Sequence, residues 1–344
     1  MFLNGQNVTP VINLKRTRSP STKLIKFDQQ TIVFFLFIVI FALFSILLPG
    51  FFSVGNLVAT LRSIAVLGIL GIAMAIVVIG RGIDLSIVAI MAVPTALILT
   101  LADSGMALWL ALLIGLLFAL GVGLLNGILV AYAEVPALFV TLAMGLGLAG
   151  LGQIGILKSD MVPWPEQMNA LMWLGGIDVL GIPSSILIVA AVVFLAWLFL
   201  NFTKLGMFIY AIGDNPAGAR TTGISVRPII VFQYALAALI AVLAGLVMAS
   251  SNSLMDTRIY NLSLIYDVIL VVVLGGVGLS GGRGGVFSVI VGTLLVGTLI
   301  NGMTILNLTL DVQNLLKGVV LLIAIALDSF LNPRNEETAQ QGDI

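Results

Sequence analysis

The chain of 344 residues contains no cysteine and no histidine, and only 9% of its residues are charged. These absences exclude disulfides, thiolate or imidazole metal sites, and nucleophilic Cys or Ser-His catalysis in its usual form. An ordinary soluble domain carries about 25% charged residues. Fifteen basic and fifteen acidic residues cancel, so the overall charge does not favour nucleic acid as a partner. The composition therefore argues against covalent chemistry and against a soluble domain.

Apolar residues make up 60% of the chain, and the mean hydropathy is +1.21. A helix needs about 20 apolar residues to cross a bilayer. We therefore expect an all-α polytopic transmembrane bundle of about 10 spans. The expected spans are 31–48, 63–80, 85–102, 106–132, 135–157, 182–200, 229–251, 268–282, 285–306 and 312–331. Pro94 in the third span, and the glycines between the eighth and ninth, indicate broken or re-entrant helices.

The distribution of basic residues predicts the orientation. A cytoplasmic N-terminus places eleven Lys and Arg residues inside and three outside, which satisfies the positive-inside rule. The inside set is Lys15, Arg16, Arg18, Lys23, Lys26, Arg81, Lys204, Arg220, Arg227, Arg283 and Arg334, and the outside set is Arg62, Lys158 and Arg258. We expect a multi-pass membrane protein with a transmembrane domain at 31–331 between cytoplasmic tails at 1–30 and 332–344.

The loop at 203–228, between the sixth and seventh spans, then faces the cytoplasm. It contains signals for a short helix over 215–222. Asn215 is suited to the N-cap and Pro216 to the first helical position. Gly223 is suited to the left-handed backbone conformation that commonly follows the C-terminal end of a helix. Because so short a helix is unstable alone, we expect it to dock against another surface.

This loop, at 204–224, resembles the cytoplasmic coupling-helix loop of bacterial ABC importer permeases of the ribose or monosaccharide-uptake type. Three further segments are similar to motifs of the same family, in the same order. They are Gly-Ile-Asp-Leu-Ser at 82–86, Asn-Gly at 126–127 with Val-Pro-Ala-Leu-Phe-Val-Thr-Leu at 135–142, and a glycine-rich turn at 274–284. Autoinducer-2 and branched-chain amino-acid permeases are related groups.

The resemblance implies the permease subunit of an ATP-driven importer for a monosaccharide or small polyol. It implies that this chain is not an enzyme and binds no cofactor, since ATP and Mg would bind separate ATPase subunits. The other implied partners are an external substrate-binding protein, a second permease chain and membrane lipid, with no nucleic acid. The implied ATPase-coupling residues are Gly213, Asp214, Asn215, Pro216, Ala217, Gly218, Ala219, Arg220 and Gly223.

Polar residues in or beside the apolar spans are candidates for the gate or the translocation path. They are Asp84, Ser86, Asn126, Gln233, Asn252, Asp267 and Asn301. For the amides, hydrogen bonds between packed helices are an equally good interpretation. Asp84 lies where two spans join, and a helix-capping acid that shapes the gate explains it better than a substrate contact does.

The chain departs from the family pattern at two positions. Val88 replaces a glycine of the Gly-Ile-Asp-Leu-Ser-Val-Gly signature, and Ile265 stands in Ile-Tyr-Asp where the family commonly has Glu-Leu-Asp. The missing acid and glycine favour a non-identical permease partner, although a homodimer stays open.

Other classes of protein fit less well. A channel or secondary transporter would bury ion-coupling acids in mid-span, and only Asp328 is a candidate, near the cytoplasmic end. An intramembrane enzyme would need a catalytic pair such as His and Asp. The Gly-x-Gly-x-x-Gly pattern at 276–281 has no βαβ context for a dinucleotide. Branched-chain amino-acid permeases are the nearest alternative, and the motif at 82–86 favours sugars over amino acids.

Overall fold

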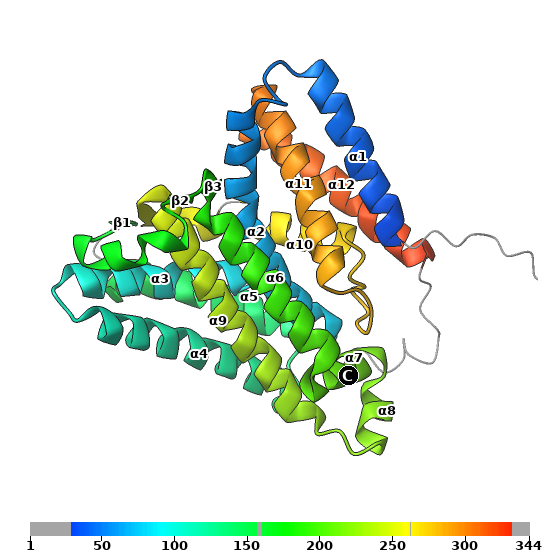
Figure 1. The fold of residues 1–344 in the computed structure, drawn as a ribbon. Coiled ribbons are helices and arrows are strands. Elements are labelled where there is room, and N and C mark those ends of the chain that lie inside the picture. The colour runs from blue at the N-terminus through cyan, green and yellow to red at the C-terminus, as the bar shows by residue number, and fades with distance from the viewer. Residues whose placement is uncertain (1–28, 157–159, 262, 332–344) are drawn as a thin grey trace, which may run out of the picture.

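The computed structural model describes residues 29–156, 160–261 and 263–331, which form an all-α bundle as predicted (Figure 1). The expected tails at 1–30 and 332–344 lie outside the described residues, except for the first residues of α1. The α-helices are α1 (Gln29–Leu47), α2 (Val54–Ile79), α3 (Ile87–Asp103), α4 (Leu108–Ala131), α5 (Ala137–Leu151), α6 (Ser184–Phe202), α7 (Lys204–Asp214), α8 (Pro216–Thr221), α9 (Val226–Asn252), α10 (Leu264–Leu274), α11 (Val286–Ile305) and α12 (Leu310–Leu331).

Each of the ten expected spans overlaps one α-helix, namely α1 to α6 and α9 to α12. Seven helices of the described chain are long and apolar enough to cross a membrane, and the apolar helices α3 and α10 are shorter.

The expected end of the eighth span is wrong. Hydropathy predicts an end at residue 282, whereas α10 ends at Leu274 and is followed by a turn in which Gly276 is left-handed, with φ +89°. Eleven residues reach about 16 Å. Helix α10 therefore reaches only about halfway across a bilayer core of about 30 Å, which is expected of a broken span.

Helix α2 is the centre of the bundle. Every residue from Ile64 to Ile79 is buried, which is expected of a helix that is apolar on all sides. It packs against α6, α9, α10 and α11, and α9 also packs against α3 and α4. The helices around the outside expose large apolar side chains, such as Phe35 on α1, Phe139 on α5 and Leu322 on α12. Such surfaces are unfavourable in water and suited to lipid.

The two ends of the bundle differ. Short elements gather near the C-terminal end of α9. They are β1 (Met161–Pro163), β2 (Asp178–Val179), β3 (Ile182–Pro183), β4 (Leu254–Asp256), the π-helix η1 (Gly152–Ile156) and the 3-10 helices η2 (Glu166–Leu174) and η3 (Thr257–Asn261). Strand β1 pairs with β4 and β2 with β3, both antiparallel. Helices α7 and α8 lie at the opposite end of α9 (Figure 1). We call these ends the outer layer and the coupling end.

Candidate coupling surface and translocation path

The coupling end contains the short helix that the sequence predicts. The Asn215 side chain accepts a hydrogen bond from the Gly218 N–H at 2.9 Å, and Pro216 is the first helical residue of α8. Gly223 follows with φ +87°, which confirms the predicted left-handed end. Helix α7 was not expected from the sequence. Its signal was Thr203, whose hydroxyl accepts from the Gly206 N–H at 3.1 Å and caps α7.

Helix α7 anchors α8 to the rest of the bundle through close backbone contacts. A Cβ on the buried Gly213 would overlap the Ile79 carbonyl oxygen at the end of α2 and the Gly282 nitrogen in the glycine-rich turn. The Gly282 N–H donates to the same Ile79 oxygen at 2.8 Å. The Tyr210 hydroxyl on α7 donates to the Gly284 carbonyl at 2.9 Å. The α7–α8 hairpin, the end of α2 and the glycine-rich turn are therefore in direct contact.

The proposed coupling residues divide into two sets by burial. Gly213 and Ala219 are buried against the chain, and Pro216 and Gly218 are half-buried. The exposed members are Asp214, Asn215, Ala217, Arg220 and Gly223. A partner at this end would therefore contact the exposed set, whereas the buried set holds the hairpin in place.

Three of the proposed path residues meet where α4 packs on the junction between α2 and α3. Asp84, Ser86 and Asn126 are fully buried. Asp84 Oδ1 accepts from the Ser86 N–H at 2.9 Å and from the Ser86 hydroxyl, and Asn126 Nδ2 donates to Ser86 Oγ at 2.9 Å. Asp84 thus orders the start of α3, and Ser86 ties that start to α4. Asp84 Oδ2 and Asn126 Oδ1 accept no hydrogen bond from any residue described here.

Two consecutive residues of α9 hold this junction from the other side. Gln233 Nε2 donates to the Ile76 carbonyl at 3.1 Å, and the Tyr234 hydroxyl donates to the Ile83 carbonyl at 3.1 Å. Helix α4 comes close to α9 because Gly127 leaves no side chain between it and the Val231 backbone. Tyr234 was not among the expected path residues, and the signal that could have identified it is a phenol hydroxyl within a long apolar span.

The remaining polar candidates lie in three separate places. Asn301 on α11 and Asn56 on α2 exchange amide hydrogen bonds of 2.9 and 3.0 Å. Asp267 forms an ion pair with Lys317 of α12 at 2.9 Å, and both side chains are only 10% exposed. Because a buried charge without a partner is costly, this pair fastens α12 to the half-length α10. The side chain of Asp328, the acid considered for ion coupling, lies outside the described part of the chain.

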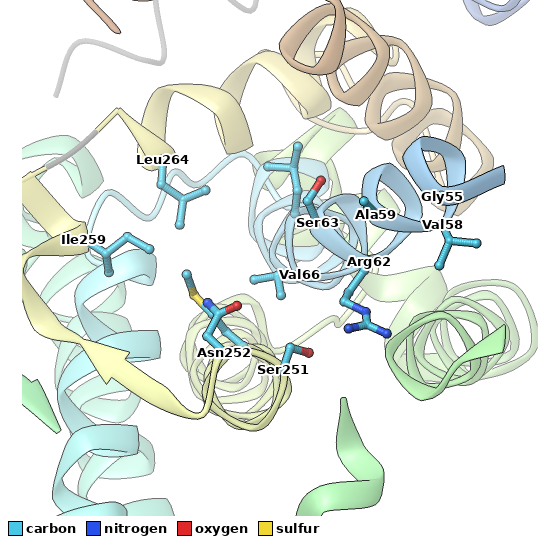
Figure 2. Close-up of a pocket in the computed structure, with 12 residues that line it drawn as sticks. Gly55, Val58, Ala59, Arg62, Ser63, Val66, Ser251, Asn252, Ile259 and Leu264 are labelled. Atoms are coloured by element: carbon cyan, nitrogen blue, oxygen red, sulfur yellow. The ribbon is translucent and has the colours of Figure 1, made fainter. Parts of the chain in front are cut away.

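The last candidate, Asn252, lines a cavity of about 490 Å³ at the outer layer, between α2, α9, η3 and α10 (Figure 2). We call this space the outer cavity. It is lined by Gly55, Val58, Ala59, Arg62, Ser63, Val66, Leu67, Met248, Ser251, Asn252, Ile259 and Leu264. Arg62 Nη2 forms an ion pair with Asp178 Oδ1 of β2 at 2.7 Å. Arg62 was not expected to lie on a helix, because the second span was expected to begin at residue 63, whereas α2 begins at Val54. Ser63 lies within the expected span, and nothing in its sequence context marked it as a lining residue.

Comparison with known proteins gives consistent matches along the chain. A family model described as branched-chain amino acid transport system / permease component matches residues 56–325. The ribose import permease protein RbsC of Escherichia coli K12 is 33% identical over 310 residues, which cover 90% of this chain and 95% of the relative.

Two further relatives match with similar identity. The galactofuranose transporter permease protein YtfT of Escherichia coli K12 is 32% identical over 80% of each chain. The L-arabinose ABC transporter permease protein AraH of Azospirillum brasilense is 33% identical over 89% of this chain and 88% of its own length. No solved structure matches the chain.

Proposed function

The chain belongs to the family of transport-system permease components, and from this premise we propose that it is the membrane subunit of an ATP-driven importer for a monosaccharide or related small polyol. One observation carries the substrate class. Relatives named for ribose, galactofuranose and arabinose each match at least 80% of the chain at 32–33% identity. Branched-chain amino acids and autoinducer-2 are the alternative cargoes.

Energy would enter through the exposed residues of α8. In this proposal two separate ATPase subunits bind ATP and Mg and dock on α8, and this chain hydrolyses nothing itself. When the ATPases close, force on α8 passes through α7 at Gly213 to the end of α2 and to Gly282. The Gly282 turn connects α10 with α11, so the displacement reaches helices near the path. ATP and the external binding protein act as ligands that favour different states of one alternating-access equilibrium.

The substrate would enter from the outer layer. A substrate-binding protein docks there in this proposal, and two permease chains, identical or not, enclose the path in the inner membrane. The orientation agrees with the basic residues that the structure describes. Five of these eight residues are at the coupling end or beside it, namely Arg81, Lys204, Arg220, Arg227 and Arg283. Arg62 and Arg258 are at the outer layer, and Lys317 is paired with Asp267 between α12 and α10.

Reporter fusions test the orientation. Green fluorescent protein fused after Ile344 is expected to fluoresce, and alkaline phosphatase fused at Asn307, between α11 and α12, is expected to be active. A phosphatase fusion within the turn at Gly223 is the matched control and is expected to be inactive. Active phosphatase at the C-terminus would reverse the orientation and would remove α8 from reach of any cytoplasmic ATPase.

A ligand screen on the cognate binding protein tests the substrate class. We expect a neutral pentose, hexose or polyol to bind with Kd below 1 μM, which corresponds to about −8.2 kcal/mol or stronger. Neutral hydroxylated ligands suit a path of amides and hydroxyls, because these groups replace hydrogen bonds to water without burying an unpaired charge. A binding protein that takes an amino acid or an anion at that affinity, and ignores sugars and polyols, would contradict the proposal.

A further inference from the structure

We propose that the outer cavity is a binding site for one neutral sugar molecule, formed within a single permease chain. The inference rests on the proposed function and adds a location and a set of contacts to it. A volume of about 490 Å³ falls within the roughly 300–1,000 Å³ range of small-molecule sites. The cavity is at the C-terminal end of α9, beside β4 and η3, on the side where a binding protein would release its ligand.

The charge of the cavity favours a neutral ligand. Arg62 is its only charged lining residue, and the Asp178 carboxylate pairs with the guanidinium at 2.7 Å. The pair contributes no net charge, so an anion would gain little. An arginine already neutralised can still donate N–H groups to hydroxyl oxygens.

The hydrogen-bonding groups offer both donors and acceptors. Figure 2 shows the Asn252 amide directed into the cavity, and within the described chain this side chain has no hydrogen-bond partner. Arg62 Nε is buried and likewise lacks a partner among the described residues. Ser63 and Ser251 donate to the carbonyls of Thr60 and Gly175, so their oxygens keep lone pairs to accept with. A sugar hydroxyl both donates and accepts, and it matches this mixture.

The remaining lining is apolar and would contact the C–H groups of a sugar ring. Val58, Val66 and Leu67 of α2 supply one wall. Met248 of α9 and Leu264 of α10 supply another. A space with a polar edge and apolar walls fits an amphipathic ring better than it fits water alone, because water gains nothing from the apolar walls.

Direct binding of sugar to the permease tests this site. The wild-type permease–ATPase complex in lipid nanodiscs, without binding protein, is titrated with tritiated D-ribose and L-arabinose. We expect saturable binding of at least one of them. Asn252→Leu removes the amide at similar volume and should weaken binding about tenfold or more, as expected for lost hydrogen bonds to a buried ligand. Ala59→Phe should abolish binding, because the ring fills the cavity.

Val54→Phe is the matched control for Ala59→Phe. It adds a ring to the same helix at a residue that is 80% exposed and does not line the cavity, so binding should stay as in wild type. Basal ATP hydrolysis shows that each variant complex is assembled, and Asn252→Leu remains decisive if Ala59→Phe does not assemble.

The outcomes separate this site from the proposed function. Normal binding-protein-dependent uptake of a sugar, with no saturable binding to the permease or with unchanged binding in both cavity variants, overturns the site and leaves the function intact. Firmly bound lipid that excludes sugar from the cavity also overturns it. A complex that transports an amino acid and no sugar overturns the proposed function itself.

Discussion

Gly213→Ala is expected to reduce sugar uptake to background, whereas Gly150→Ala is expected to leave uptake at the wild-type level. The two changes add the same methyl group to glycines of the same chain. At Gly150 on α5 nothing lies within 4 Å of the added Cβ. At Gly213 the Cβ would overlap two backbone atoms, the Ile79 carbonyl oxygen and the Gly282 nitrogen.

The reason for so large an effect is that neither backbone atom can rotate away. The Gly282 N–H to Ile79 carbonyl bond of 2.8 Å lies at the same point, so the added methyl group forces apart α7, the end of α2 and the glycine-rich turn. Overpacking of a well-packed site costs about 1–3 kcal/mol or more. The α7–α8 hairpin would then lose its contacts with the end of α2 and the glycine-rich turn, through which we expect its movement to be transmitted.

The measurements are uptake by whole cells, ATP hydrolysis stimulated by the liganded binding protein, and the amount of assembled complex. We expect Gly213→Ala to insert into the membrane and to lose stimulated hydrolysis and uptake together. Wild-type uptake by Gly213→Ala would show that this contact does not carry the coupling movement.

The short capped helix α8 could be predicted from sequence because its signals are local. Asn215, Pro216 and Gly223 each act within one turn of the helix that they define. The ends of α2 and α10 could not be placed by hydropathy. Asn56, Thr60 and Arg62 interrupt the apolar pattern at the start of α2, although Asn56 is satisfied by Asn301 and Thr60 by the Asn56 carbonyl. Glycine counts as apolar or neutral on a hydropathy scale, so the hydropathy profile does not show where α10 ends. The turn that follows α10 requires left-handed backbone.

The candidate path was less predictable because its geometry depends on distant parts of the chain. Asn126 is 40 residues from Ser86, and the hydrogen bond between them follows only from the packing of α4 on the α2–α3 junction. The same applies to the ion pair of Asp267 with Lys317, which are 50 residues apart. Residue type indicates which polar side chains need a hydrogen-bond or ion-pair partner. The packing of the helices determines which residue that partner is. Their roles in the path stay predictions.

Ala217→Glu is expected to abolish uptake and substrate-stimulated ATP hydrolysis without disturbing the fold of this chain. Ala217 is exposed in the first turn of α8, where a carboxylate is favoured by the helix dipole by about 0.3–1 kcal/mol. The helix should therefore still form. Ala219 is a poorer choice, because it is buried and a charge there would disturb α8 itself. Gly218 is also unsuitable, because a Cβ there would crowd the Asn215 cap at 3.2 Å.

The matched control for this substitution is Ala133→Glu. Ala133 is exposed in the loop between α4 and α5, at the same end of the bundle, so the same charge is added outside the proposed docking surface. Co-purification of the ATPase should fall at least tenfold for Ala217→Glu and stay unchanged for Ala133→Glu, because central contacts of an interface carry most of its binding energy and a charge buried there without a partner is costly. If Ala217→Glu keeps the ATPase bound and stimulated, the exposed face of α8 is not where the ATPase docks, and the force that drives transport must enter the permease elsewhere.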